Sequence, residues 1–226
     1  MTPPRAPKAI IFDWDNTLVD SFPAIHGALV ATLIAMGHAP WSYEETRARA
    51  RRSLRDSFPE LFGARWEEAR DHFYRHFADH HMRDLRPITG SQALLEALAG
   101  AGCPMGIVSN KMGSYLRAEI EALGWSRYFL RAVGAQDAAS DKPHPECVAL
   151  VLAAAGLAAA PDIWLVGDTA LDMECAHAAG VTAVLVGDTG DDVARHPPAH
   201  RVGSLPELEN LITKFWAGLV TECRVT

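Results

Sequence analysis

Short apolar runs that each end in polar or acidic residues recur along the chain, and stretches with helical spacing separate them. The apolar runs are 8–12, 105–108, 132–135, 163–166 and 183–186. The helix-like stretches are 91–99, 114–123, 146–155 and 170–179. Strands that alternate with helices form parallel sheets covered on both faces, and such strands are apolar throughout. The pattern therefore predicts an α/β fold with a doubly wound, Rossmann-like parallel sheet, in which the second run stops at Ser109-Asn110.

Residues 21–86 interrupt this alternation. They contain no β-branched run, whereas Ala, Leu, Arg, Glu and aromatic residues recur at helical spacing. Pro23 and Pro87 lie near the two ends, where they are typical boundary markers. We therefore expect a small all-helical domain at 21–86, inserted after the first strand of a core domain that comprises 1–20 and 87–226. Its aromatic residues are expected to form its own core.

The charge balance limits the classes of partner. The chain has 21 Lys and Arg against 28 Asp and Glu, a net charge of -7, which gives no general attraction to nucleic acid or to anionic membranes. The longest apolar stretch, 148–160, is too short to span a bilayer. Residues 1–7 carry three prolines and lack the apolar region of a signal peptide, and the four cysteines show no Cys-x-x-Cys spacing. We expect a cytoplasmic protein with reduced thiols.

Carboxylates are concentrated where the predicted strands end. Asp13 and Asp15 follow the first run, and Asp168 and Asp172 follow the fourth. Ligands of open α/β sheets bind outside the carboxyl ends of the strands, so these carboxylates and Ser109 should converge on one crevice. Clustered carboxylates repel one another and need a cation, and a set of oxygen ligands suits Mg²⁺.

Four segments in this order resemble the four motifs of haloacid-dehalogenase-superfamily phosphatases. They are 13–20 (DWDNTLVD), 108–110 (VSN), 142–143 (KP) and 167–172 (GDTALD). The stretch 141–146 and the helical insertion are similar to the branch that contains phosphoglycolate phosphatases with a helical cap. Trp14 and Asn16 depart from the commonest first motif, at positions that normally supply no catalytic side chain. The resemblance implies a Mg²⁺-dependent phosphatase for a small phosphate monoester, with phosphoglycolate as the leading candidate.

Phosphoryl transfer requires a nucleophile, charge neutralisation, protonation of the leaving group and an oriented water. We assign Asp13 as the nucleophile, which forms an aspartyl-phosphate. Asp15 is assigned as the general acid that protonates the leaving oxygen and then accepts a proton from the attacking water. Lys142 is expected to neutralise charge on the phosphate and on Asp13.

The resemblance also implies a ligand set for the metal and for the phosphate. Mg²⁺ would be held by the Asp13 carboxylate, the backbone carbonyl of Asp15 and the Asp168 carboxylate. Asp172 would orient a metal-bound water or Lys142. The expected phosphate ligands are the hydroxyls of Thr17 and Ser109 and the backbone N–H of Asn110.

Three further patterns have two interpretations each. His72, His76 and His80, with Glu68, share a helix face that could bind a metal, although we favour an ordinary, partly exposed face. Gly187-Asp188-Thr189 repeats part of the fourth motif but lacks an aspartate four residues later, so we interpret it as a loop. An arginine run could include one residue that recognises an anionic substrate, although a solvated helix is our default. Its members are Arg47, Arg49, Arg51, Arg52 and Arg55.

Other functions stay open at this point. A phosphomutase of the β-phosphoglucomutase type and a sugar-phosphate phosphatase would use the same core, and a non-catalytic regulatory module is the third alternative. Dehalogenase chemistry is disfavoured because it needs neither Asp15 as an acid nor Mg²⁺. The expected partner is a small phosphorylated metabolite, and the sequence does not specify an oligomeric state.

Overall fold

The computed structural model describes residues 6–50, 52–187, 190 and 192–222, with the side chains of 216–222 left undescribed. Within this part, six strands form a parallel sheet in the order β5-β4-β1-β6-β7-β8. The strands are β1 (Ala9–Phe12), β4 (Met105–Met112), β5 (Arg131–Ala135), β6 (Ile163–Gly167), β7 (Thr182–Val186) and β8 (His200–Val202). The predicted parallel α/β fold is confirmed.

Helices cover both faces of this sheet, and β1 shows why its residues are apolar at every position. Ile10 and Phe12 point to one face and Ala9 and Ile11 to the other, all of them buried. The first face packs against α5 (Ser91–Gly100), α6 (Gly113–Ala122) and α9 (Leu205–Glu222). The second packs against α7 (Glu146–Ala154) and α8 (Ala170–Ala179). A fully buried isoleucine or phenylalanine contributes about 1.5–3 kcal/mol of stabilisation.

The structure corrects the expected strand boundaries in one place and adds β8 and α9 to the α/β layers. β4 does not stop at Ser109-Asn110 but continues to Met112, because the chain pairs with β5 again after a register shift. β8 and α9 were not predicted from the sequence. β8 has only three residues, whereas α9 carries a local signal: Glu207 N–H donates to Ser204 Oγ (3.4 Å) and the Glu207 carboxylate accepts from Gly203 N–H (2.9 Å).

Between β1 and α5 the chain forms four helices that pack on one another. They are α1 (Phe22–Ala35), α2 (Tyr43–Arg49), α3 (Leu54–Phe62) and α4 (Trp66–Asp84). We call residues 22–84 the helical segment. Phe58, Phe62, Phe73 and Phe77 are buried in its own core, as predicted. The chain enters and leaves it through two adjacent antiparallel strands, β2 (Val19–Asp20) and β3 (Arg86–Pro87).

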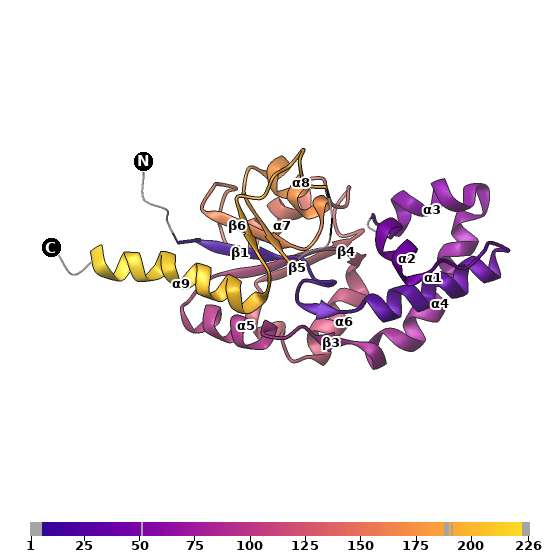
Figure 1. Cartoon of the computed structure of the whole chain (residues 1–226), viewed down its shortest axis with the longest axis horizontal. Helices are drawn as coiled ribbons and strands as arrows, with labels where there is room; N and C mark the ends of the chain where they lie inside the picture. Colours follow the sequence, from indigo (N-terminus) through magenta and orange to yellow (C-terminus); the bar gives the residue numbers. More distant parts are fainter. Residues whose placement is uncertain (1–5, 51, 188–189, 191, 223–226) are drawn as a thin grey trace.

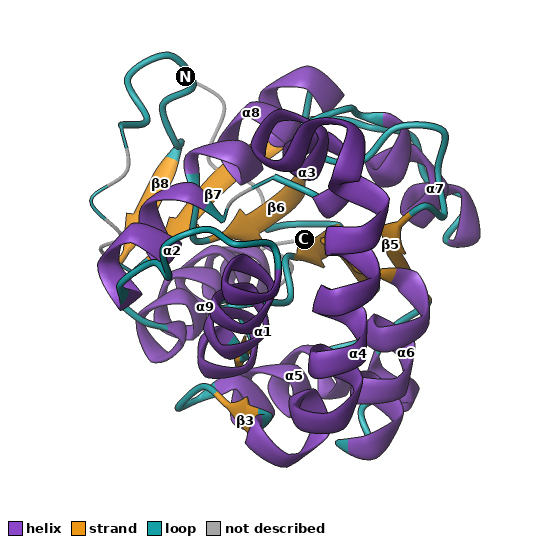
Figure 2. Cartoon of the chain, turned by 90° about the vertical axis from the view of Figure 1, so that its right-hand side faces the viewer, coloured by secondary structure: helices purple, strands orange, loops and turns teal. Residues whose placement is uncertain are grey.

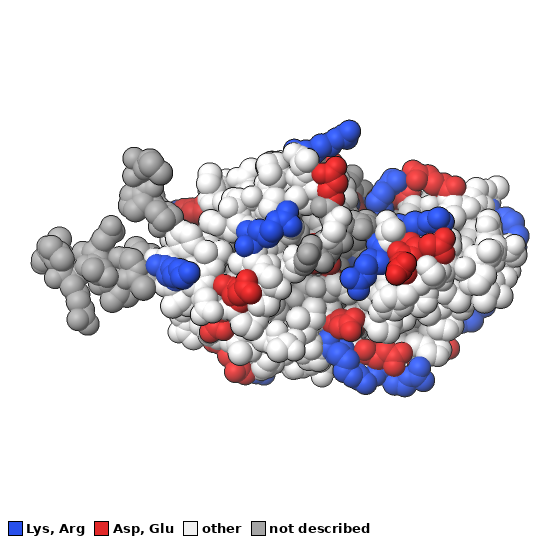
Figure 3. Space-filling model, viewed as in Figure 1, with Lys and Arg blue, Asp and Glu red and all other residues white. Residues whose placement is uncertain are grey.

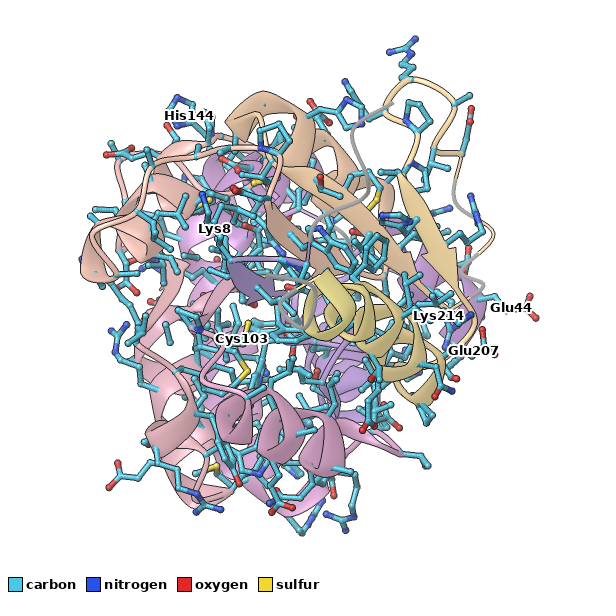
Figure 4. The ribbon with its side chains drawn as sticks, turned by 90° about the vertical axis from the view of Figure 1, so that its left-hand side faces the viewer. Lys8, Glu44, Cys103, His144, Glu207 and Lys214 are labelled. Carbon is cyan, nitrogen blue, oxygen red and sulfur yellow. The ribbon has the colours of Figure 1, made fainter. Side chains whose placement is uncertain are left out.

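The helical segment lies beyond the carboxyl ends of the sheet strands, since β1 runs toward it in Figure 1. Figure 2 shows α1 to α4 in front of the sheet when this side faces the viewer. The opposite end, with Lys8 and Cys103 just before β1 and β4, faces the viewer in Figure 4. Any site built from residues that follow the strands therefore opens toward the helical segment. No helix of the described residues combines the length and the apolar character that crossing a membrane requires.

Candidate active site

The loop after β1 carries three of the predicted site residues, Asp13, Asp15 and Thr17. Asp13 continues the strand direction, because its backbone N–H donates to the carbonyl of Val166 on β6 (2.8 Å). The chain then turns at Asn16, whose φ of 61° lies in the left-handed region that asparagine tolerates better than most residues. The Asn16 N–H donates to the carbonyl of Val19 (2.7 Å) and closes the turn. Because asparagine can adopt this left-handed conformation, it can occupy the position where the commonest first motif has glycine.

Lys142 joins two carboxylates that are far apart in the sequence. Its Nζ lies 2.6 Å from Asp13 Oδ1 and 2.6 Å from Asp172 Oδ1. All three side chains are buried, with exposures of 4% for Lys142, 9% for Asp13 and 1% for Asp172. The structure therefore brings the predicted nucleophile, the predicted phosphate-side cation and Asp172 into direct contact.

Asp172 is fixed by the start of α8. Its Oδ2 accepts from the backbone N–H (3.1 Å) and the hydroxyl (2.6 Å) of Thr169. The bond from the Thr169 backbone N–H to the Asp172 side chain belongs to a capping box, which stabilises the first turn of the helix. Gly167 leaves the space that the side chain needs, because a Cβ at Gly167 would lie 2.3 Å from Asp172 Cγ. The same carboxylate thus caps α8 and holds Lys142.

Burial and charge shift the titration of this cluster. Burial raises the pKa of Asp13 to about 7, and the Asp172 and Asp15 carboxylates add to this effect while Lys142 opposes it. Burial, with Asp13 and Asp172, also raises the pKa of Asp168 well above its ordinary value. Although burial alone would lower the pKa of Lys142, its contacts with Asp13 and Asp172 raise it well above 10.5. Lys142 therefore stays cationic, but this one cation does not offset the burial and mutual repulsion that disfavour the ionised forms of Asp13 and Asp168.

The same cluster fits a divalent cation. Asp13, Asp168 and Asp172 each offer a carboxylate oxygen, and these atoms lie within 4.8 Å of one another. A set of oxygen ligands with excess negative charge is what Mg²⁺ prefers. The metal-ligand set implied by the sequence resemblance contains the backbone carbonyl of Asp15 and does not contain the Asp172 carboxylate. In the structure the Asp172 carboxylate belongs to the same group of oxygens.

The predicted phosphate ligands Thr17, Ser109 and Asn110 each have a side-chain polar atom that is hydrogen-bonded within the protein. Thr17 Oγ1 lies between Asp13 Oδ2 (3.4 Å) and Asp168 Oδ1 (3.3 Å). Ser109 Oγ accepts from the backbone N–H of Lys111 (3.1 Å). Asn110 Nδ2 donates to the carbonyl of Lys142 (3.2 Å), while its Oδ1 is buried without a partner among the described residues.

Sequence reasoning missed a second group of polar residues beside Asp15. Lys111 Nζ lies 2.6 Å from Asp15 Oδ1 and 2.6 Å from Glu119 Oε2. Glu119, on α6, also accepts from His81 Nδ1 on α4. The available signal was periodicity, since Glu119 shares the buried face of α6 with Leu116 and Ile120. A charged residue within such a face indicates a buried partner.

A cavity of about 750 Å³ opens over the carboxylates and extends into the helical segment. Its floor includes Asp13, Asp15, Ser109, Lys142 and Asp168. Its upper wall comes from all four helices of the segment and is mainly apolar, with arginines among the lining residues. These wall residues include Phe22, Leu29, Trp41, Tyr43, Arg47, Arg49, Arg52, Phe58, Leu61, Phe73 and Tyr74. Substrate can therefore contact the predicted catalytic residues and the helical segment together.

The arginine run divides among several environments. Arg52 pairs with Glu60 (3.0 and 3.1 Å) on the exposed surface, and Figure 3 shows basic and acidic side chains side by side on the helical segment. Arg55 does not follow the expectation of a solvated arginine. Its Nε and Nη2 donate to the two carboxylate oxygens of Asp141 (2.6 and 2.5 Å). Asp141 is 1% exposed and directly precedes Lys142, so this pair joins α3 to the site loop. Arg51 lies outside the described residues.

Among the described residues, the histidine face and the cysteines make no hydrogen bond or ion pair with the carboxylate cluster. The rings of His76 and His80 stack with centroids 4.2 Å apart, and His72, His76 and His80 are half-buried, as the favoured interpretation of a partly exposed face expects. Cys103, Cys147 and Cys175 are buried free thiols. Asp188, Thr189 and Cys223 lie outside the described residues.

Comparisons with known proteins agree with this geometry. Residues 10–186 match the family of haloacid dehalogenase-like hydrolases. The chain is 32% identical over 184 residues to phosphoglycolate phosphatase from Xylella fastidiosa, covering 79% of this chain and 80% of that protein. It is 34% identical over 185 residues to phosphoglycolate phosphatase from Pectobacterium atrosepticum, covering 78% and 79%.

Solved structures show the same fold. A haloacid dehalogenase-like family hydrolase from Streptococcus pneumoniae superposes with a TM-score of 0.78 at 23% identity, covering 88% of this chain and 95% of that chain. A haloacid dehalogenase-like hydrolase from Bacteroides fragilis gives a TM-score of 0.82 at 21% identity, covering 89% and 99%. At these identities the likeness concerns the fold alone.

Proposed function

Since this chain belongs to the haloacid dehalogenase-like hydrolases, we propose that it hydrolyses phosphoglycolate with Asp13 as the nucleophile and Mg²⁺ as the cofactor. It is a phosphoric monoester hydrolase, the class of its relatives named phosphoglycolate phosphatase. The observation that carries the proposal is the contact of Asp13 with Lys142 (2.6 Å) beside the carboxylates of Asp168 and Asp172. A nucleophile, a buried cation and a metal-binding group thus share one crevice.

The reaction has two steps, the transfer of the phosphoryl group to Asp13 and the hydrolysis of the resulting aspartyl-phosphate. The Asp13 carboxylate attacks phosphorus, the ester P–O bond breaks, and the Asp15 carboxyl gives its proton to the leaving oxygen. Water then attacks the aspartyl-phosphate, Asp15 takes the proton, and inorganic phosphate leaves. Lys142 neutralises charge on the transferring group throughout, because its side chain is held in place before substrate arrives.

Mg²⁺ would be held by Asp13 and Asp168, with the Asp15 carbonyl and the Asp172 carboxylate as further candidates. When bound, it would neutralise phosphate oxygens and offset the repulsion among these carboxylates. Thr17, Ser109 and Asn110 remain the proposed phosphate ligands.

We further propose that residues 21–86 act as a cap over a core formed by 1–20 and 87–226. Support comes from the position of the helical segment beyond the strand ends and from its share of the cavity wall. A cap in this place would exclude water from the reacting phosphate and would contact the leaving group. Substrate choice would then depend on residues such as Trp41, Tyr43 and Arg47.

Hydrolysis of a sugar phosphate is the second candidate. The cavity of about 750 Å³ is favourable for it, since this space exceeds what a two-carbon acid needs. Aromatic wall residues such as Trp41 and Tyr43 also suit a sugar ring.

Phosphate release from a panel of monoesters tests both candidates. The panel contains phosphoglycolate, ethyl phosphate, glucose 6-phosphate and β-glucose 1-phosphate, each with Mg²⁺ and with a chelator. We expect the highest kcat/KM for phosphoglycolate, loss of turnover with the chelator, and loss of turnover in Asp13→Asn. Asp162→Asn is the matched control, because Asp162 pairs with Lys8 at the opposite end of the sheet and should leave activity unchanged. Absence of turnover on every ester would contradict the phosphatase proposal, and conversion of glucose 1-phosphate to glucose 6-phosphate would indicate a mutase.

A further inference from the structure

The carboxyl group of Asp15 is anchored through one oxygen. Its Oδ1 contacts Lys111 Nζ (2.6 Å) and accepts from the Ser21 hydroxyl. No described residue contacts Oδ2 by a hydrogen bond or an ion pair. The half-buried Asp15 side chain lines the cavity, so Oδ2 is the oxygen left for a substrate. Whatever fixes Oδ1 therefore sets the direction in which Oδ2 points.

Lys111 is itself held on a second side. Its Nζ lies 2.6 Å from Glu119 Oε2, and the side chains of Lys111 and Glu119 are only 4% and 0% exposed. The Nζ also lies 5.4 Å from the ring centroid of Phe77. Although burial lowers the pKa of Lys111, Asp15 and Glu119 raise it above its ordinary value. Lys111 is thus a fixed cation whose position does not depend on Asp15 alone.

Glu119 connects this cation to two distant segments. Its Oε2 accepts from Trp14 Nε1 (2.7 Å), and Trp14 immediately precedes Asp15. Its Oε1 lies 2.8 Å from Nδ1 of His81 on α4, within the helical segment. Both carboxylate oxygens of the buried Glu119 therefore have partners, and such contacts offset the cost of burying its charge. The contacts form one chain from α4 through Glu119 and Lys111 to Asp15.

We propose that Lys111 is a positioning residue for Asp15, and that the buried Glu119 and His81 hold it in the orientation that aims Asp15 Oδ2 at the leaving group. The inference rests on the proposed function, because it takes Asp15 as the general acid. Among the described residues Lys111 pairs with Asp15 and Glu119 and not with Asp13, whereas Lys142 pairs with Asp13 and Asp172. A loss of Lys111 should consequently impair proton transfer to the leaving oxygen and spare attack by Asp13.

The dependence of the rate on the leaving group separates these effects. Phosphoglycolate and ethyl phosphate have alkoxide leaving groups that need a proton, whereas p-nitrophenolate leaves without one. For Lys111→Met we expect kcat/KM to fall on the order of 10²-fold on both alkyl esters. We expect a fall of less than about fivefold on p-nitrophenyl phosphate, since that step needs little acid catalysis. Arg117→Met, which removes an exposed cation from the same helix as Glu119, should change none of the three values.

Three results would overturn the inference while the wild type remains active. An equal loss on all three esters would show general damage or a role in binding phosphate. A loss confined to phosphoglycolate would show that Lys111 binds the substrate carboxylate and does not position Asp15. Unchanged values on all three would show that Asp15 needs no such anchor. A wild type without turnover on any ester would instead contradict the proposed function, so the two failures are distinguishable.

A second variant covers the case in which Lys111→Met does not fold. The double variant Lys111→Met/Glu119→Gln removes both buried charges together and leaves neither unpaired. It should keep the near-ultraviolet circular dichroism of the wild type and show the same selective loss on the alkyl esters. A folded double variant with wild-type kcat/KM on ethyl phosphate would contradict the inference.

Discussion

Two buried lysines line the same crevice and have matching surroundings. Lys142 contacts Asp13 and Asp172, and Lys111 contacts Asp15 and Glu119, with all four N–O distances at 2.6 Å. The side chain of each lysine is 4% exposed. Each therefore joins one residue of the first motif to a carboxylate on a helix that follows a strand.

The two lysines differ in what fixes the second carboxylate. Asp172 is held by Thr169 at the start of its own helix, so the second carboxylate that contacts Lys142 is fixed by the α/β layers and not by the helical segment. Glu119 is held in part by His81, which belongs to the helical segment. The comparison teaches that the direct partners of Lys142 both belong to the α/β layers, whereas the contacts of Lys111 extend through Glu119 to His81 in the helical segment.

Loss of Lys142 should give the largest effect. Lys142→Met leaves Asp13 and Asp172 without their shared cation and removes a preorganised charge from the transferring phosphate. We expect kcat to fall by about 10³-fold on every ester, including p-nitrophenyl phosphate, measured as initial rates of product release. Lys8→Met, at the far end of the sheet, is the control. Equal rates for Lys142→Met and wild type on p-nitrophenyl phosphate would remove the distinction between the two lysines.

The next effect concerns the docking of the helical segment. Arg55→Met leaves the Asp141 carboxylate, 1% exposed, without its two hydrogen bonds from α3. We expect the free energy of unfolding to fall by about 2 kcal/mol, measured by urea denaturation. Arg52→Met removes an exposed pair with Glu60 on the same helical segment and should cost less than about 1 kcal/mol. Similar values for both variants would mean that the Arg55 contact does not dock the segment.

The smallest effect is a change in acid stability. Burial raises the pKa of Glu119, but hydrogen bonds from His81, Lys111 and Trp14 hold it below its ordinary value of 4.5. A carboxyl with a lowered folded pKa stabilises the protein above its unfolded pKa, and this stabilisation is lost as the pH falls through the folded pKa. The groups that face Glu119 are His81, Lys111 and Trp14, with Asp15 beyond Lys111.

We therefore expect Glu119→Gln to flatten the decline of unfolding free energy below pH 4.5, measured by urea denaturation at successive pH values. Glu121→Gln, exposed on the same helix, is the control and should keep the wild-type slope. Parallel pH curves for wild type and Glu119→Gln would show that the network does not favour the ionised form of Glu119.

The phosphate side of the site was largely predictable from the sequence. Asp13, Lys142, Asp168 and Asp172 occur in ordered motifs next to strand ends, and carboxyl ends of parallel strands meet at one edge. Their meeting in one cluster follows from that topology. The role of the Asp172 carboxylate as a member of the oxygen group did not follow, because it depends on how α8 packs over Gly167.

Asp15 was predicted as the general acid, but the residues that hold it were not predicted, although weak signals existed. His81 continues the buried face formed by Phe73 and Phe77 at intervals of four residues. The histidine pattern considered in the sequence was instead the partly exposed face of the same helix. Arg55 belongs to an arginine run that also includes solvated residues. No feature of the neighbouring sequence therefore distinguishes Arg55 as the partner of Asp141. Pairings across 86 and 38 residues, as in Arg55–Asp141 and His81–Glu119, are not encoded in any local period.

By itself the sequence determined the parallel α/β fold, the helical insertion and the family, because apolar periodicity and short motifs are properties of neighbouring residues. Only the tertiary structure decided that Lys111, Glu119 and His81 form one buried chain of contacts that ends at Asp15. The physical reason is that a buried charge must find partners wherever the packing of two layers brings them, and that packing depends on the whole chain.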